Sequence, residues 1–489
     1  MSFSEDGSSL FTSGRNGGVN VRSTADPDSM ISPSGIDVMS GKVSASKWSF
    51  LEPLSSYSSS PKKDFVAVSS DAGWISLYEY EYGRQVSRII LGRKRSWVTL
   101  DGSNRFDTTS ISELDSVYFT FSDAELSPYS LEVFLRDYYE PNLLGRLLSC
   151  REAEASGEEP DACSEAFKPV RPLAELNRIQ PNVEIAGVRR GGSADEVFVE
   201  VEVSEVEDLS QKNGKTHTGV YDVRLFRDGQ LVGQWPKPVD GAFADDLAAW
   251  REASRVEMPQ GETSSRHTFE VKLASGAVGE TVEFTTYAFN EDRVKSATWT
   301  DDSYTVPEDL APRVPRAYVI TVGVNAYENP ERNLSFAVAD AEAMSSSLQE
   351  IEGYEVVRLS LISDYERDGV EAADLATKEN IREVLSLLAG EGDAERQRLR
   401  NALGKGVDSL VEATPDDLVI LTFSGHGYTE QGRFYILPSD SGTGGITKAV
   451  LPKLISSEEL TEWLRNVDAG EMVMIVDACH SAAGVPAGF

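Results

Sequence analysis

Two segments near the C-terminus carry the residue types that thiol chemistry requires. Cys479 follows the apolar run "MVMIV" within "DACHS", and His426 follows the apolar run "LVILTF" within "SGHG". A cysteine acts as a nucleophile in its thiolate form, and a neighbouring imidazole either accepts the thiol proton or stabilises the anion. Small glycine neighbours let the backbone turn sharply and leave the imidazole of His426 accessible. If the two apolar runs are strands of one sheet, Cys479 and His426 form a nucleophile–base pair.

The other histidines and cysteines stand in less suitable surroundings. The tripeptide Asp-Ala-Cys occurs a second time at Cys163, within an acidic segment that would disfavour a thiolate and that offers nothing to position it. Cys163 could form a disulfide with Cys150, and the sequence does not decide whether it does. His217 and His267 fall in a β-rich region, and His480, directly after the expected nucleophile, should point away from its sulfur. We assign no catalytic role to any of these residues.

The elements around the candidate pair follow an α/β rhythm from Arg316 onward. Strand-like runs such as "AYVITVGV" and "YEVVRLSLIS" alternate with stretches of helical spacing such as "TKENIREVLSLLAG". This alternation is typical of a mostly parallel sheet with helices on both faces. Functional residues of such sheets gather at the carboxyl ends of the strands, which is where His426 and Cys479 fall.

The first 180 residues read as two segments. Residues 1–95 contain short β segments, two of which follow a turn-strand-turn-strand course and resemble degenerate WD repeats without the Trp-Asp dipeptide. Residues 96–180 combine a helical segment, interrupted at Pro141, with the acidic linker "REAEASGEEPDACSEAF".

Residues 181–308 are all-β in pattern. "VFVEVEV" alternates strictly, and an Asp228-Gly229 turn joins two further strands, which favours an immunoglobulin-like β-sandwich. It carries no catalytic constellation, so a spacer or interaction role is expected. The predicted fold class is multidomain, with N-terminal all-β regions followed by an α/β domain over residues 312–489.

The C-terminal motifs resemble a known peptidase family. "LTFSGHG", followed by "FYILPSD" and "VMIVDACHS", looks like the caspases, and most closely their metacaspase and bacterial orthocaspase branch. The resemblance covers residues 316–489, and the order of WD-like region, sandwich and caspase-like domain is similar to bacterial multidomain members. It implies Cys479 as nucleophile and His426 as general base and acid. It also implies an oxyanion hole made by the N–H groups of Gly427 and Cys479, where one fixed donor is typically worth roughly 3–4 kcal/mol of the barrier.

Carboxylates set the expected specificity. Caspases that cut after aspartate line their pocket with arginine, whereas metacaspases place carboxylates there and cut after Arg or Lys. Asp477 and Asp340 match the metacaspase positions, and paired carboxylates hold a guanidinium through charge-assisted bonds. Ser424, at the end of the His426 strand, is expected to join the substrate-binding set. The alternatives are that Asp340 only faces solvent and that Asp477 only orients its loop, and the single Arg332 nearby does not make a pocket for anionic substrates.

The composition of the chain restricts the classes of molecule that it is expected to bind. The chain has 489 residues with 46 Lys and Arg against 80 Asp and Glu, a formal net charge of −34. Such a surface repels nucleic acid and anionic lipid, and no apolar stretch reaches the ~20 residues that span a bilayer. We expect a protein or peptide substrate, protein partners bound through the β regions, no nucleic acid and no membrane. Three cysteines and a start without a basic–apolar leader favour a cytoplasmic location.

The predicted function is a cysteine endopeptidase of metacaspase type that cleaves after Arg or Lys. The alternatives are a non-catalytic interaction protein with a relic caspase-like domain, and a caspase-like peptidase with acidic-residue specificity. The sequence requires no cofactor, but metacaspases often need calcium, so a Ca²⁺ requirement stays open. In the caspase fold two further strands follow the nucleophile, whereas the chain ends ten residues after Cys479. The domain is therefore expected to be incomplete and poorly active alone.

Overall fold

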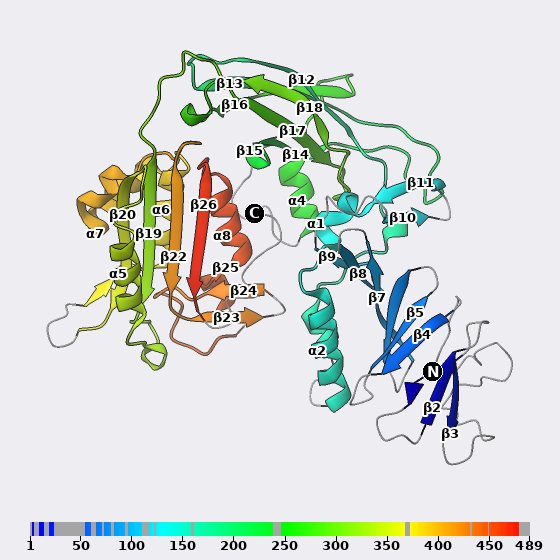
Figure 1. Cartoon of the computed structure of the whole chain (residues 1–489). Coiled ribbons are helices and arrows are strands. Elements are labelled where there is room, and N and C mark those ends of the chain that lie inside the picture. The colour runs from blue at the N-terminus through cyan, green and yellow to red at the C-terminus, as the bar shows by residue number, and fades with distance from the viewer. Residues whose placement is uncertain are drawn as a thin grey trace. The chain divides into compact units, whose positions relative to one another are not determined.

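The computed structural model describes residues 2–3, 9–13, 19–23, 54–59, 65–70, 73–79, 83–92, 96–109, 117–121, 124–157, 161–237, 246–366, 372–430, 433–447 and 449–478. The chain divides into two compact units (Figure 1). The first comprises Met1–Ile179, Asp208–Thr216 and Asp292–Lys295, and the second comprises Gln180–Glu207, His217–Glu291 and Ser296–Phe489. No helix in the described ranges is both long enough and apolar enough to cross a membrane.

The first unit contains an antiparallel sheet in which each strand pairs with the next one in the chain. Its order is β4-β5-β6-β7-β8-β9, with bounds Leu54–Ser59, Phe65–Ser70, Trp74–Glu79, Gln85–Leu91, Trp97–Asp101 and Phe106–Thr108. A separate sheet, β1-β2-β3, spans Ser2–Phe3, Ser9–Ser13 and Val19–Ser23. The six-stranded sheet is wider than the four-stranded blade of a propeller. It also runs past residue 95, because the β-branched and aromatic residues at the start of β8 favour a further strand.

Helices follow a short hairpin in the remainder of this unit. The hairpin is β10 (Tyr118–Phe121) with β11 (Ala124–Ser130), and then come the 3₁₀ helix η2 (Leu131–Phe134), α1 (Leu135–Tyr138), α2 (Leu143–Ser156), α3 (Ala162–Ala166) and the 3₁₀ helix η3 (Leu173–Glu175). The break between α1 and α2 falls at Pro141, as the helical spacing predicts. Buried Leu131, Phe134 and Tyr138 join the core beneath them.

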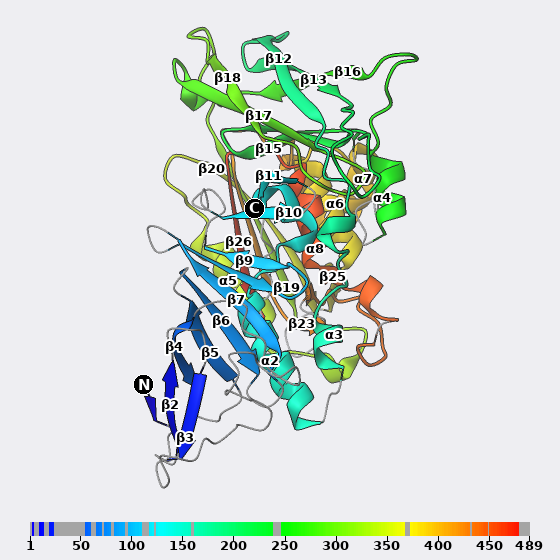
Figure 2. The same ribbon diagram turned by 90° about the vertical axis from the view of Figure 1, so that its right-hand side faces the viewer.

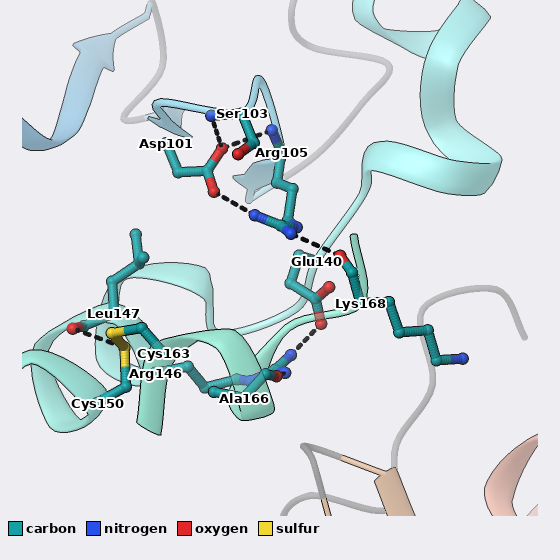
Figure 3. Close-up of polar contacts among 10 residues, drawn as sticks. All are labelled: Asp101, Ser103, Arg105, Glu140, Arg146, Leu147, Cys150, Cys163, Ala166 and Lys168. Carbon is teal, nitrogen blue, oxygen red and sulfur yellow. Dashed lines mark hydrogen bonds and ion pairs between the residues drawn. A yellow bond between two sulfur atoms is a disulfide. The ribbon is translucent and has the colours of Figure 1, made fainter. Parts of the chain in front are cut away.

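The acidic segment 151–167 was expected to be an exposed linker, and this expectation was wrong for part of it, since residues 151–156 belong to α2 and residues 162–166 form α3. Figure 3 shows a disulfide between Cys150 in α2 and Cys163 in α3, whose Cα atoms lie 4.8 Å apart. Arg146 of α2 also donates to the carbonyl of Ala166. Arg105 donates to the carbonyl of Lys168 at 2.5 Å. These contacts hold residues 161–168 against α2 and the β8–β9 turn, which composition alone did not indicate.

The second unit begins with two antiparallel sheets. One has the order β12-β13-β16, with bounds Asn182–Arg190, Glu196–Ser204 and Ser264–Lys272; the other has the order β15-β14-β17-β18, with bounds Gln230–Trp235, Tyr221–Arg227, Thr281–Phe289 and Trp299–Thr305. Helix α4 (Leu247–Ser254) lies in the β15–β16 connection. Every second residue of β13 is buried, as its alternation predicts. The hairpin turn has φ of 49° at Asp228 and 86° at Gly229, the conformation of a two-residue turn.

The α/β part of the second unit is built on one mostly parallel sheet. Its order is β21-β20-β19-β22-β26, with bounds Ala373–Asp374, Glu355–Asp364, Arg316–Val324, Leu418–Ser424 and Glu471–Asp477. The four longer strands are parallel to one another, and the short β21 is antiparallel to β20. A smaller sheet, β23-β24-β25, spans Gly427–Glu430, Arg433–Ile436 and Ile455–Ser456.

Helices cover both faces of the parallel sheet (Figures 1 and 2). α5 (Ala337–Ser347) packs closely on one face, where a Cβ at Gly323 would lie 2.8 Å from that of Ala341. On the other face, α6 (Lys378–Leu388), α7 (Asp393–Leu403) and α8 (Ser457–Arg465) pack their apolar side chains against Tyr318, Ile320 and Val322 of β19. α7 continues into the 3₁₀ helix η6 (Gly404–Ser409), and two further 3₁₀ helices, η5 (Pro330–Arg332) and η7 (Leu451–Lys453), lie in loops.

In the described part of the chain, β26 is the last strand of this sheet. Its Met472, Met474 and Val476 pack against the core on the α6 side. Val473 and Ile475 face the other way and are 43% and 37% exposed. The sequence indicated a buried strand, but among the described residues one face of β26 is left open, because α5 packs on β19, β20 and β22 instead.

Candidate active site

β22 leads His426 to the carboxyl edge of the parallel sheet. All seven residues of β22 are buried, since it is an inner strand. At Gly425, a Cβ would lie 2.9 Å from both Cζ of Phe423 and Oη of Tyr327, so a larger residue there would have to displace one of these side chains. The N–H of Gly425 donates to the carbonyl of Asp477 at 3.2 Å. This bond joins the ends of β22 and β26.

The backbone of His426 is fixed by two hydrogen bonds. Its N–H donates to Oη of Tyr327 at 2.9 Å, and its carbonyl accepts from the N–H of Leu437 at 3.0 Å. The Tyr327 ring centroid lies 5.2 Å from that of the imidazole. Tyr327 is 6% exposed, and burial raises the pKa of Tyr327 well above its ordinary value. Its hydroxyl therefore stays neutral and serves as a fixed acceptor beside His426.

A backbone carbonyl orients the imidazole. Nε2 of His426 lies 2.9 Å from the carbonyl oxygen of Arg332. A carbonyl oxygen can only accept, so Nε2 carries a proton. In the neutral ring, Nδ1 then holds the lone pair and can accept a proton from a nearby thiol. The arrangement suits a general base.

The segment that offers this carbonyl is anchored at its own side chain. Arg332 is the last residue of η5, and its guanidinium donates to Oγ of Ser441 at 3.3 Å and to the carbonyl of Gly442 at 3.1 Å. It also donates to the carbonyl of Gly444. The charge of Arg332 is thus directed at neutral oxygens of residues 441–444, and the same residue presents its carbonyl to His426.

The expected substrate-binding residues lie on separate elements near the carboxyl edge of the sheet. Asp477 ends β26 and Asp340 lies in the first turn of α5, and both are exposed. Within the part of the chain that the structure describes, neither carboxylate forms an ion pair, so both remain available to a cation. Ser424 pairs in register with Asp477 and is 7% exposed. Gly427, the expected oxyanion donor, begins β23 and pairs with Ile436.

Cys479 and His480 lie outside the described residues, so the roles expected for Cys479 stay predictions. Cys479 follows Asp477 by two residues, as His426 follows Ser424, and Ser424 and Asp477 are register partners. Among the described residues, no group of three or more His, Cys, Asp or Glu side chains is arranged to hold a metal ion.

Residues 316–487 match the family model of the caspase domain. The match covers about a third of the chain and begins at the first residue of β19. This match supports assignment of the segment to the caspase-family cysteine peptidases in general.

No curated protein matches the sequence. Among solved structures, the WD40 domain of SCAP from fission yeast aligns with 61% of this chain and 65% of its own, at 10% identity and a TM-score of 0.11. The chain thus spans less than two thirds of that neighbour, and a likeness of this size says nothing about the fold.

Two contributors to the caspase domain's site were missed by sequence reasoning. Tyr327 was assigned no role, although it contacts both the backbone and the ring of His426. Arg332 was considered for its charge, whereas its carbonyl makes the contact to the imidazole. A backbone oxygen leaves no residue-type signal, and the turn-forming residues in "NAYENPERN" are the one local feature that could have indicated a loop here.

Proposed function

We propose that the chain is a cysteine endopeptidase of metacaspase type, with Cys479 as nucleophile and His426 as general base and acid. The observation that carries the proposal is the hydrogen bond between Nε2 of His426 and the carbonyl of Arg332. It leaves Nδ1 as the proton acceptor at the end of β22, which pairs with β26, the strand that leads to Cys479. The match of residues 316–487 to the caspase domain adds support.

The proposed reaction begins with transfer of the Cys479 proton to Nδ1 of His426. The thiolate attacks the peptide carbonyl, and the N–H groups of Gly427 and Cys479 stabilise the oxyanion. The C–N bond then breaks as the imidazolium gives its proton to the leaving amine. Water, deprotonated by His426, hydrolyses the resulting thioester and frees the thiol.

Cleavage after Arg or Lys is the specificity that the charges favour. Asp340 and Asp477 are exposed carboxylates without a described ion-pair partner, and a guanidinium can bind two carboxylates through charge-assisted bonds. Arg332, which could have selected an acidic side chain, instead donates to residues 441–444. The formal net charge of −34 also favours basic substrates.

Peptide hydrolysis tests this proposal. The full chain is assayed, with and without Ca²⁺, on matched peptides carrying Arg, Lys or Asp before a fluorescent leaving group. Arg and Lys peptides should be cleaved by the full chain, if only slowly, and Cys479→Ala and His426→Ala should each abolish this cleavage. The control is His217→Ala, since His217 is 55% exposed and pairs with Glu205 in the sandwich. Turnover that persists in Cys479→Ala, or faster cleavage after Asp than after Arg, would contradict the proposal.

A second candidate is a non-catalytic interaction protein. The observation that favours it is the open face of β26, where Val473 and Ile475 are exposed at the edge of the described sheet. Absence of turnover on all three peptides, together with a Cys479 thiol no more reactive than a free cysteine, would favour this candidate over the peptidase.

A further inference from the structure

Two loops of the caspase domain are bonded to the two antiparallel sheets of residues 182–305, which share one apolar core and which we call the sandwich, within the same compact unit. Residues 412–417 lead into β22, the strand that precedes His426, and residues 466–470 lead into β26, the strand that precedes Cys479. We call the contacts between the sandwich and these two loops the junction. The junction lies at the amino ends of the strands, opposite the edge that carries the site.

Arg227 is the central residue of the junction. It ends β14, is 5% exposed, and donates from its guanidinium to both carboxylate oxygens of Asp468, at 2.9 and 3.3 Å. The same guanidinium donates to the carbonyl of Lys272 at 2.6 Å and to Gln230 at 3.1 Å. Gln230 in turn donates to the carbonyl of Ala469 at 2.7 Å. The hairpin β14–β15 therefore binds the 466–470 loop through a buried charge and a neutral amide.

The other loop is bound through Asp416. Its carboxylate accepts from the backbone N–H groups of Ser275 and Gly276 at 3.0 and 3.1 Å. Oγ of Ser275 accepts from the N–H of Arg313 at 3.0 Å. A cavity of about 320 Å³, lined among others by Lys272, Ser275, Arg313 and Asp416, lies alongside. Asp416 therefore ties the 412–417 loop to the backbone of residues 275–276.

The two loops are also locked to each other. The carboxylate of Asp417, which is 1% exposed, accepts from the N–H groups of Arg316 and Thr414 at 2.7 and 2.8 Å. The carbonyl of Asp417 accepts from the N–H of Gly470 at 2.9 Å. A Cβ at Gly470 would lie 2.2 Å from the carbonyl oxygen of Pro415, so the loops are in direct contact. A shift of one loop must therefore move the starts of β19, β22 and β26 together.

We propose that the sandwich is a positioning element for the peptidase site, acting through Arg227 and Asp468 on the starts of β22 and β26. β22 and β26 are paired along their whole seven-residue length, so a displacement at their amino ends reaches the carboxyl edge about 20 Å away. A misplacement of about 1 Å between reacting groups can cost on the order of 10²-fold in rate. The proposal rests on the proposed peptidase function for its catalytic readout, and its mechanical part stands apart from it.

The test uses the full chain with Arg227→Met, Asp468→Asn and the double variant. The control is Arg266→Met, which removes an exposed arginine that pairs with Glu200 and Glu202 on the other sheet. Turnover of the Arg peptide is resolved into kcat and KM, and amide hydrogen exchange is followed in β22 and β26. Gln230→Leu gives a milder variant that breaks the contact to Ala469 if the charge variants fold poorly.

Each junction variant should lower kcat by at least about tenfold with KM changed less than about threefold, and should speed exchange in β22 and β26. The double variant should be no worse than the poorer single variant, because the pair acts as one contact. Unchanged kcat with unchanged exchange in the junction variants, or equal effects in Arg266→Met, would overturn the proposal. If the parent cleaves none of the peptides, the proposed peptidase function is wrong. Amide exchange in β22 and β26 that is faster than in the parent only in the junction variants would then still support the positioning role. Unchanged exchange in those variants would overturn it.

Discussion

Replacing Tyr327 with phenylalanine removes one oxygen atom from the surroundings of His426 and leaves the ring in place. That oxygen accepts the N–H of His426 at 2.9 Å. A buried donor that loses its acceptor costs about 1–3 kcal/mol. Because His426 is half-buried, water can partly replace the hydroxyl, and we expect Tyr327→Phe to lower the free energy of unfolding by about 1 kcal/mol.

The same substitution should affect the reaction. If the hydrogen bond holds His426 in its reactive position, a loss of about 1 kcal/mol corresponds to a rate about fivefold slower. The assay is alkylation of Cys479 by iodoacetamide in the full chain, followed by mass, alongside urea unfolding. Tyr354→Phe serves as the control, since Tyr354 packs against the opposite face of the sheet. Equal unfolding free energies and equal alkylation rates in Tyr327→Phe and the parent would refute the positioning role of this hydroxyl.

Three further substitutions test other parts of the account. Asp477→Asn should raise KM for Arg peptides while leaving thiol alkylation largely intact, and an equal loss of alkylation would show damage to the nucleophile instead of the pocket. Burial raises the pKa of Asp440, so the folded state binds this proton more tightly and the stability of the protein falls as pH rises through that pKa. Asp440→Asn should therefore unfold at a higher urea concentration than the parent at pH 7, and the difference should shrink toward pH 4. A difference that stays constant over this pH range would contradict burial as the cause. Cys150→Ser should lower the free energy of unfolding of the first unit by about 2–3 kcal/mol without changing peptide turnover. Titration of thiols in the denatured, unreduced parent should find one free thiol. Three free thiols would show that the disulfide does not form.

The α/β arrangement could be predicted from the sequence because its elements carry strong local signals. The apolar runs ending at Val324 and Ser424 are fully buried inner strands, and "TKENIREVLSLLAG" begins with a Thr377 cap and buries one helical face. Strict alternation in β13 likewise predicts its burial. Such patterns indicate which side of an element faces the core, so they can be interpreted without knowledge of the rest of the chain.

Other features depend on contacts between distant residues and could not be predicted from local patterns. Cys163 stands in an acidic segment of low apolar content, and its bond to Cys150 depends on how α3 docks on α2. The exposure of Ile475 depends on which strands α5 covers, because residues 472–476 of the strand are all apolar and do not distinguish its two faces. The sandwich had no residue pattern that marked Arg227 as a partner of Asp468, which lies 241 positions further along the chain.

Of the candidate site, only the reactive side chains could be predicted from the sequence. His426 was indicated by glycines at the end of an apolar strand, and the structure gives it a bonded imidazole at that strand end. The oxygen of Arg332 and the hydroxyl of Tyr327 reach it from the loop after β19, roughly 100 positions earlier. That proximity follows from the in-register pairing of β19 with β22, which no local pattern encodes.

The central claim is that His426 activates Cys479, and the most direct measurement is the alkylation rate of Cys479 at pH 6.5 in the parent and in His426→Ala. The disulfide removes the other two cysteines from reaction under non-reducing conditions, so the signal belongs to one thiol. The account predicts that the parent reacts at least about tenfold faster than His426→Ala, because the imidazole stabilises the thiolate. Equal rates in the two proteins would show that His426 and Cys479 do not act as a pair.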